Sequence, residues 1–364
     1  MSKILDVRSY TEEVLRAAQA LRDPAAQEVV RDAEAKIAEA AAVVRAGGIV
    51  AFPTETVYGL GADAFSEPAL KKIYAAKGRP SDNPSIVHIA RASDLGLLAR
   101  EYTPGVVKLA DAFWPGPLTI IVEKRAEVPA AVSGRLSTVG VRLPDDPVAL
   151  ALIRMAGTPV AAPSANLSGR PSPTRAADVI ADLDGKADVI LAGADSRIGI
   201  ESTVVDMTAT PPQILRPGYL SAADLAAGLD AEVVLDPALL AETGEPKGDG
   251  SPFGSLTPRS PGMKYRHYAP KAEMVVLEGD RDRVEREALR LKALNERIGR
   301  RVGVLLFEAS DFTGAAHDFY ARLRDLDASG VDLILAGALP QENDLGFSVM
   351  NRMMKAAGYH VIRV

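Results

Sequence analysis

The stretch Gly47–Ala64, GGIVAFPTETVYGLGADA, joins a short apolar run directly to a polar turn. The run Ile49–Phe52 predicts a buried strand, and Pro53 ends it because proline cannot donate to a strand ladder. Three hydrogen-bonding side chains then stand at the end of the strand: Thr54, Glu55 and Thr56. Ligands bind at strand ends in open α/β sheets, so these residues form either part of a binding site or a polar turn that caps a helix.

The sequence around this stretch predicts an α/β fold with a mixed sheet. Residues 11–46 are rich in Ala, Glu and Arg at helical spacing and are broken at Asp23-Pro24, which predicts two helices. From residue 47 to about residue 234, β-rich runs such as VGVRL and VILAG are mixed with short amphipathic helices such as EPALKKIYAAKG. Several runs are too closely spaced for strict βαβ repetition, so we expect a mixed sheet with flanking helices.

The last third of the chain divides into a linker and a small domain. Residues 236–270 are dense in Gly, Pro and Ser, which is typical of a linker, but their second half carries MKYRHY, an unusual content for a passive tether. Residues 271–364 alternate strands and helices regularly. This pattern predicts a small doubly wound, Rossmann-like α/β domain.

The composition is that of a globular protein, and no apolar run approaches the roughly 18 residues that a membrane span needs. The first residues, MSKILDVRSYTEE, lack the apolar core of a signal peptide. The absence of cysteine excludes disulfides and cysteine-ligated metals and fits a reducing compartment, so we expect a cytoplasmic protein with no membrane partner. The net charge of −6 and the pI of about 5.5 argue against a broad basic surface and stable nucleic-acid binding.

Two cations follow a predicted helix in the segment KGRPSDNP. Lys77 and Arg79 lie on one side of an extended segment, and Asn83 follows the arginine four residues later. Neighbouring cations repel each other unless an anion joins them, and arginine suits bidentate contacts with phosphate or carboxylate. The alternative is a lysine that stabilises the helix dipole, followed by a solvated arginine.

Other polar residues are predicted to gather at strand ends. The loop AAPSANLSGRPSPT, residues 161–174, can present hydroxyl and backbone N–H groups to phosphate, although it also fits a surface turn. Arg142 lies in the apolar strand pattern VGVRLP and needs an anionic partner, which is either a ligand or an internal Asp or Glu. Arg216 and Ser202 also stand at strand ends, whereas His88 alternates with apolar positions and is more typical of a satisfied core histidine.

The motifs of several other enzyme classes are absent from the sequence. It contains no P-loop, no HExxH, no GxSxG and no GxGxxG that opens a helix after a strand, and its histidines have no ligand spacing. The cations and hydroxyls instead suit a site for a nucleoside triphosphate and a second small anion. Such a site accelerates group transfer by positioning and charge stabilisation.

The order of the motifs resembles one enzyme family. GGIVAFPTETVYGLGADA, KGRPSDNP, PGPLTIIVEK, VGVRLP, PSANLSGRPSPT, ESTVVD, RPG and SPGMKYRHYAP occur in the order and approximate spacing of long-form L-threonylcarbamoyladenylate synthases. The resemblance implies a YrdC-like catalytic domain with a twisted mixed sheet over residues 35–235, a linker and lid over 236–270, and a C-terminal α/β domain over 271–364. The helical extension over residues 1–34 is longer than is usual in the family.

The resemblance implies a nucleotidyltransferase that makes L-threonylcarbamoyladenylate from L-threonine, bicarbonate or CO2 and ATP, with release of pyrophosphate. This reaction is the first step of tRNA N6-threonylcarbamoyladenosine (t6A37) modification. Lys77 and Arg79 are then the expected catalytic pair. The expected ATP-binding residues are Lys77, Arg79, Asn83, Thr138, Ser164, Asn166, Ser172, Arg216 and Tyr265, and the expected threonine-binding residues are Thr56, His88, Arg142 and Ser202.

The resemblance also implies Mg²⁺ that accompanies ATP, no metal ligands from the protein, and a downstream tRNA threonylcarbamoyltransferase complex as a candidate partner. A carbamate intermediate decomposes in water, so the site must close, and either Tyr265 or Tyr268 of the linker would cover it. Two alternatives are weaker. An RNA-binding module is disfavoured by the acidic pI and the lack of an aromatic platform, and a carbamoyltransferase is disfavoured by the lack of cysteines for zinc fingers.

Overall fold

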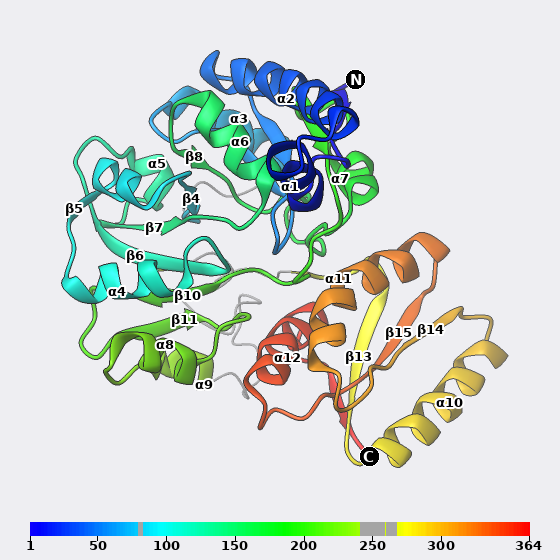
Figure 1. The fold of residues 1–364 in the computed structure, drawn as a ribbon. Helices are drawn as coiled ribbons and strands as arrows, with labels where there is room; N and C mark the ends of the chain where they lie inside the picture. Colours follow the sequence, from blue (N-terminus) through cyan, green and yellow to red (C-terminus); the bar gives the residue numbers. More distant parts are fainter. Residues whose placement is uncertain (79–82, 241–258, 260–267) are drawn as a thin grey trace.

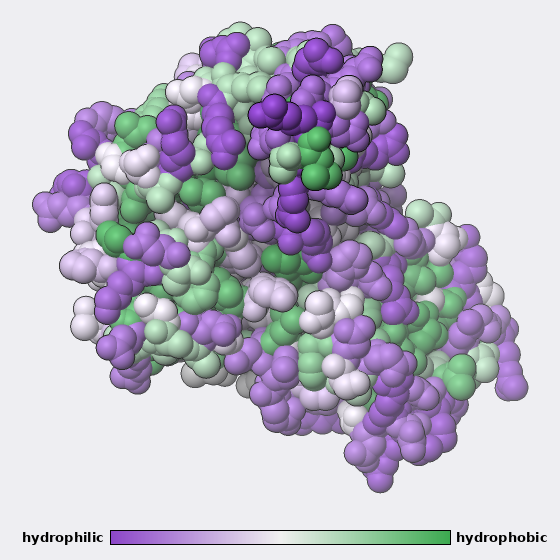
Figure 2. Space-filling model, viewed as in Figure 1, coloured by the Kyte–Doolittle hydropathy of each residue, from purple (hydrophilic) through white to green (hydrophobic). Residues whose placement is uncertain are grey.

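The computed structural model describes residues 1–78, 83–240, 259 and 268–364, which form two lobes (Figure 1). The first lobe contains the described residues up to 240, and the second contains residues 268–364. None of the helices in these ranges is long and apolar enough to cross a membrane. Figure 2 shows a surface on which hydrophobic side chains are interspersed among hydrophilic ones, with hydrophilic side chains dominant over α10 (Arg281–Arg297).

The N-terminal segment contributes both helices and a strand to the first lobe. The helices α1 (Glu12–Ala20) and α2 (Pro24–Arg45) are separated at the expected break, where the Asp23 carboxylate accepts a hydrogen bond from the Ala25 amide at 2.9 Å. The strand β1 (Lys3–Asp6) pairs in parallel with β9 (Val189–Ala192) and was not expected. The predicted domain boundary at residue 35 lies inside α2.

The large sheet of the first lobe is mixed, which confirms the sequence prediction. Its order is β1-β9-β2-β3-β8-β4-β7-β6-β10-β11-β12, and β5 pairs with β6 at one side. The antiparallel pair β2 and β3 encloses the Thr-Glu-Thr turn. The bounds are β2 (Val50–Phe52), β3 (Gly59–Asp63), β4 (Val87–His88), β5 (Ala99–Glu101), β6 (Leu118–Lys124), β7 (Thr138–Arg142), β8 (Val160–Ala161), β10 (Thr203–Asp206), β11 (Gln213–Arg216) and β12 (Val234–Leu235).

Helices cover this sheet on both faces, which explains why a central strand such as β2 is apolar and buried at every position. Val50 and Phe52 pack into a cluster with α2 and α6, whereas Ala51 between them packs into the cluster on the other face. The helices after α2 are α3 (Glu67–Lys77), α4 (Pro104–Phe113), α5 (Ala130–Ser133), α6 (Pro147–Ala156), α7 (Ala176–Leu183), α8 (Ala222–Leu229) and α9 (Pro237–Leu240), with a 3₁₀ turn at Ala92–Leu97.

The second lobe is the doubly wound α/β domain that the sequence predicts. Its four parallel strands have the order β14-β15-β13-β16, with α10 on one face and α11 and α12 on the other (Figure 1). The bounds are β13 (Glu273–Glu278), β14 (Val302–Leu305), α11 (Phe312–Ser329), β15 (Leu333–Gly337), α12 (Asp344–Ala356) and β16 (Val361–Arg363). The helices α11 and α12 face the first lobe.

Two ion pairs join the lobes, one buried and one more exposed. Arg324 of α11 is buried, and its Nη2 donates to the Asp182 carboxylate at 2.8 Å while its Nε donates to the Pro171 carbonyl at 3.1 Å. Arg175 and Asp325 form a second ion pair between the lobes at 2.6 Å, but the Asp325 side chain is 61% exposed. Burial of a charge is tolerated only when it is paired, so the first pair is expected to matter more for stability.

The change Arg324→Met therefore should lower the free energy of unfolding by about 2 to 4 kcal/mol, because it leaves the Asp182 carboxylate buried without this partner. Asp325→Asn at the exposed pair is the control and should cost less than about 1 kcal/mol. Urea unfolding of the full chain measures both values. Equal effects of the two substitutions would contradict this account of the interface.

Candidate functional site

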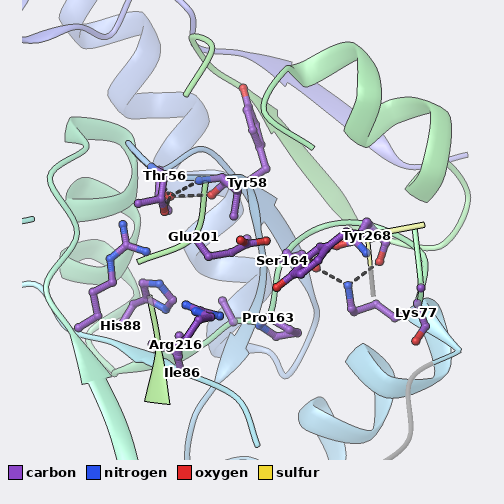
Figure 3. A pocket seen from close by; sticks show the side chains of 18 residues that line it. Thr56, Tyr58, Lys77, Ile86, His88, Pro163, Ser164, Glu201, Arg216 and Tyr268 are labelled. Atoms are coloured by element: carbon purple, nitrogen blue, oxygen red, sulfur yellow. Dashed lines mark hydrogen bonds between the residues drawn. The ribbon is translucent and has the colours of Figure 1, made fainter. Parts of the chain in front are cut away.

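A cavity lies where several strand ends of the first lobe meet the start of the second lobe (Figure 3). Its walls come from the turn between β2 and β3, the end of α3, the strands β4, β7 and β11, and the loop after β8. Seven of the expected site residues line it: Thr56, Lys77, His88, Arg142, Ser164, Asn166 and Arg216. The fold thus brings together side chains that are separated by up to 160 positions in the sequence, from Thr56 to Arg216.

The Thr-Glu-Thr turn is held by its own hydroxyl groups. The Thr54 hydroxyl donates to the Val57 carbonyl at 2.6 Å and accepts from the Val57 amide at 3.3 Å. The Thr54 and Thr56 hydroxyl oxygens lie 2.9 Å apart, and both residues line the cavity. The turn is therefore rigid and points polar groups into the cavity, so it forms part of the site and does not serve as a helix cap.

Arg142 and Glu55 form a buried ion pair beside this turn. The Nη2 atom of Arg142 lies 2.7 Å from Oε2 of Glu55, and the two side chains are 4% and 1% exposed. The charges are close but not aligned, because among the described residues neither the Glu55 oxygens nor Nη2 of Arg142 have a hydrogen-bond partner. Arg142 also donates from Nε to the Gly116 carbonyl at 3.3 Å. Arg142 thus has the internal carboxylate that the sequence left as one alternative, and it also lines the cavity.

His88 faces the same cavity from β4 and stays neutral. Burial, together with the nearby charge of Arg142, lowers the pKa of the His88 imidazole to about 3. Its Nδ1 atom has no hydrogen-bond partner in the part of the chain that the structure describes. The ring packs edge-on against Phe52, with centroids 6.0 Å apart. A neutral imidazole here can accept or donate one hydrogen bond to a ligand, but it is not a cation at physiological pH.

Lys77 binds the loop of residues 161–174, called here the serine-rich loop, which forms another wall of the cavity. It is the last residue of α3, and its ammonium group donates to the backbone carbonyls of Ser164 and Asn166. The Ser164 hydroxyl donates to the Asn166 side chain at 2.5 Å, and the Asn166 amide donates to the Arg170 carbonyl at 2.9 Å. The loop is therefore an ordered wall of the cavity and differs from a surface turn.

Glu201 lines the cavity and was not among the expected site residues. The Ser172 hydroxyl donates to its Oε1 at 2.6 Å, Arg352 donates to its Oε2 at 2.7 Å, and the Tyr320 hydroxyl lies 3.0 Å from both oxygens. Burial alone would raise the pKa of this carboxyl, but the charges of Arg352 and Arg216 outweigh it and lower the pKa to about 2. Glu201 is therefore ionised at physiological pH. Its partners on α11 and α12 are more than 100 positions away, so no local pattern indicates them.

Tyr268 closes one side of the cavity in this structure (Figure 3). The side chain is buried and packs on Tyr320, with ring centroids 5.4 Å apart. Burial and the charge of Glu201 raise the pKa of its hydroxyl to about 12. The Ala269 amide also donates to the Gly169 carbonyl at 2.8 Å, which fastens this part of the chain to the serine-rich loop. Tyr265, the other tyrosine considered for a lid, lies outside the described residues.

Two expected residues stand directly behind the cavity wall. Ser172 is fully buried and bound to Glu201. Ser202 is also fully buried, and its hydroxyl lies 2.8 Å from the Thr119 hydroxyl and accepts from Arg216 at 3.1 Å. Both serines support side chains that line the cavity without lining it themselves.

Three other expected residues are placed elsewhere or are not described. Thr138 lines a separate small cavity together with Arg259. Asn83 is buried next to the segment 79–82, outside the lining of the main cavity. Arg79 lies outside the described residues. Their roles stay predictions.

The donor set of the site suits anions better than a protein-held metal. Among the described residues, no group of three or more His, Asp or Glu side chains could hold a metal ion. The two carboxylates near the cavity, Glu55 and Glu201, are each engaged by an arginine.

The chain is similar to known proteins over most of its length. Residues 42–218 match the family model described as "Telomere recombination", and residues 230–358 match the model described as "Threonylcarbamoyl-AMP synthase, C-terminal domain". The chain is 45% identical over 341 residues to a threonylcarbamoyl-AMP synthase of Pyrococcus abyssi, covering 91% of this chain and 96% of the relative. It is 43% identical to the synthase of Bacillus subtilis, covering 90% and 94%.

Solved structures show the same fold. The crystal structure of P. abyssi Sua5 complexed with L-threonine has a TM-score of 0.83 at 44% identity and covers 91% of this chain and 96% of its own. The structure of a P. abyssi Sua5 variant with two alanine substitutions has a TM-score of 0.86 at 42% identity and covers 100% and 98%.

The buried, neutral His88 has a testable consequence for acid stability. Its pKa is about 3 in the folded chain, below the ordinary value of 6.5, so between these pH values the unfolded chain binds a proton that the folded chain does not. The stability is fully present above pH 6.5 and decreases as the pH falls toward 3. His88→Gln removes this contribution, so its free energy of unfolding should decrease less than that of the wild type between pH 7 and about pH 4.5. Urea unfolding at both pH values measures the difference, and parallel pH profiles would refute the assignment.

Proposed function

The chain belongs to the threonylcarbamoyl-AMP synthase family, and on this basis we propose that it synthesises L-threonylcarbamoyladenylate from L-threonine, bicarbonate or CO2 and ATP, with release of pyrophosphate. The product is the activated intermediate for N6-threonylcarbamoyladenosine formation in tRNA. The observation that carries the proposal is the convergence of Lys77, Arg142 and Arg216 with the Thr56 and Ser164 hydroxyls on one cavity. Such a cavity can accept two anionic substrates side by side.

The threonine half of the site is assigned to the wall near the Thr-Glu-Thr turn. The crystal structure of P. abyssi Sua5 is a complex with L-threonine, which supports a threonine site in the same fold. Here Arg142 is the cation for the threonine carboxylate, because it lines the cavity beside this turn, and Glu55 balances its charge before the ligand binds. Thr56 and the neutral His88 offer hydrogen bonds to the rest of the amino acid.

The nucleotide half is assigned to the wall formed by Lys77, the serine-rich loop and Arg216. The threonine amine captures CO2 to give a carbamate, one carbamate oxygen attacks the α-phosphorus of ATP, and pyrophosphate leaves. Lys77 and Arg216 would stabilise the negative charge that grows on the leaving group. Mg²⁺ bound to the ATP phosphates would share this task. Because an adenylyl group is transferred, the reaction class is nucleotidyl transfer.

Closure of the cavity protects the carbamate from water. Tyr268 already forms one wall, and it is the described tyrosine that fits the role of a cover. A downstream tRNA threonylcarbamoyltransferase would consume the unstable product, and the proposed place of both proteins is the cytoplasm. Both the partner and the location are parts of the proposal.

The direct test is pyrophosphate release from ATP and Mg²⁺, with threonine and bicarbonate each present or omitted and with serine in the place of threonine. The proposal predicts release only when both co-substrates are present, and a nucleotide product that contains the threonyl group by mass spectrometry. Release without threonine, or no release at all, would overturn the proposed function.

Lys77→Met tests the assignment of the phosphate wall. The substitution removes a cation next to the leaving group and should cost about 2 to 4 kcal/mol of transition-state stabilisation in kcat/KM. Lys71→Met on the exposed side of the same helix is the matched control and should retain wild-type activity. If Lys77→Met keeps wild-type turnover, Lys77 has no role in the chemistry.

A further inference from the structure

The second lobe places a fully buried arginine behind the wall of the cavity, where it binds the lining residue Glu201. Arg352 lies on α12 and is 1% exposed, and it is among the largest fully buried side chains in the described part of the chain. An arginine is almost never buried unless each of its charged groups is satisfied. Its acceptors, apart from one in its own helix, all belong to the first lobe.

These acceptors tie together two segments of the cavity. Nε of Arg352 donates to the Glu201 carboxylate at 2.7 Å, and Nη2 donates to the Glu201 carbonyl at 3.1 Å. Nη1 donates to the Pro217 carbonyl at 2.9 Å. Glu201 precedes β10 and Pro217 follows β11, so one side chain holds the ends of two paired strands.

The backbones of the two lobes approach closely at the same place. The Ser348 hydroxyl, one turn before Arg352, donates to the Gly218 carbonyl at 2.8 Å. Gly199, which has a φ of +83°, lies so close to α11 that a Cβ atom would be 2.3 Å from the His317 carbonyl oxygen. The segment that carries Glu201 is therefore seated on α11 and α12, and its position depends on the second lobe.

Inside the cavity, Glu201 and Arg216 carry opposite charges, and each is bound by other groups. Glu201 and Arg216 both line the cavity, and their charges influence each other. Among the described residues, the Arg216 guanidinium nevertheless donates only to the carbonyl and hydroxyl oxygens of Ser202, each at 3.1 Å. The Glu201 carboxylate is held by Arg352 and Tyr320 of the second lobe, together with a serine of the first lobe. Figure 3 shows Glu201 beside Arg216, with its carboxylate group directed toward Tyr268.

We propose that Arg352 is a positioning residue for the nucleotide site: it binds the Glu201 carboxylate and thereby keeps the Arg216 guanidinium available for the anionic substrate. Without Arg352, the nearest strong cation for Glu201 is Arg216, and their pairing would cancel the charge that faces the phosphates. The inference rests on the proposed function only for the identity of the anion, the ATP triphosphate. It gives the second lobe a defined task in a site that lies mainly on the first lobe.

ATP binding to the full-length chain, measured by calorimetry with Mg²⁺, tests this proposal. Arg352→Met keeps an unbranched apolar stem but removes the guanidinium group, and it should raise the Kd for ATP about tenfold or more because Glu201 then competes for Arg216. Arg352→Lys keeps the positive charge, so its Kd for ATP should lie between those of the wild type and Arg352→Met. Asp325→Asn removes an ion pair at the same interface but away from the cavity, so it should bind ATP like the wild type.

A second substitution separates positioning from simple structural support. In the Arg352→Met background, Glu201→Gln replaces the competing carboxylate by a neutral amide and should restore ATP affinity to within about threefold of the wild type. A purely structural role of Arg352 predicts that ATP affinity follows the free energy of unfolding across the single and double variants, because neutralising a buried carboxylate also relieves strain. The positioning role predicts a loss of ATP affinity in Arg352→Met at a urea concentration and temperature where the variant is still fully folded, and its recovery in the double variant. Tyr320→Phe, which removes one hydroxyl donor to Glu201 with almost no change of volume, should weaken ATP binding about two- to fivefold.

The outcomes distinguish this inference from the proposed function. Wild-type ATP affinity in Arg352→Met, or a double variant that binds no better than Arg352→Met, would overturn the inference and leave the function intact. Failure of the wild-type chain to bind ATP would overturn both. If Arg352→Met does not fold, Tyr320→Phe takes its place. ATP affinity that Glu201→Gln restores in the Tyr320→Phe background supports the inference, and affinity that stays reduced overturns it.

Discussion

The site depends on the carboxylate of Glu201, which is buried at the seam of the two lobes and also lines the cavity. Glu201 is ionised away from bulk water, which is costly unless cations and hydrogen-bond donors surround it. The donors come from both lobes: Ser172 from the first, and Tyr320 and Arg352 from the second. Docking of the second lobe therefore bears directly on the cavity, since Glu201, which the second lobe holds, also lines it.

The cavity itself follows from the way in which a mixed sheet places strand ends. Parallel and antiparallel neighbours bring the end of β7 and the end of β11 to the same region, and each ends in an arginine, Arg142 or Arg216. Both arginines have partners within the protein, so neither is an isolated buried charge. The site thus balances two demands: its cations must be stable without a ligand, and they must still attract anions when the ligand arrives.

Much of this organisation could be predicted from the sequence, and the failures have physical reasons. The apolar run before Pro53, the helix that ends at Lys77 and the alternation after residue 271 are local patterns, so the corresponding elements are where the sequence indicates. Arg142 could be recognised as needing an anion, but its partner Glu55 could not be chosen from the sequence. Glu201 was missed because its partners are distant in the chain, and the strand β1 was missed because its pairing with β9 is equally remote.

The most direct test of the account is a crystal structure of the full chain with a non-hydrolysable ATP analogue, Mg²⁺ and L-threonine. The account predicts the phosphates between Lys77 and Arg216, the threonine carboxylate on Arg142, and the Glu201 carboxylate still bound to Arg352. Ligands bound outside this cavity would contradict the site, and a Glu201 side chain turned from Arg352 onto Arg216 in the complex would contradict the role assigned to the second lobe.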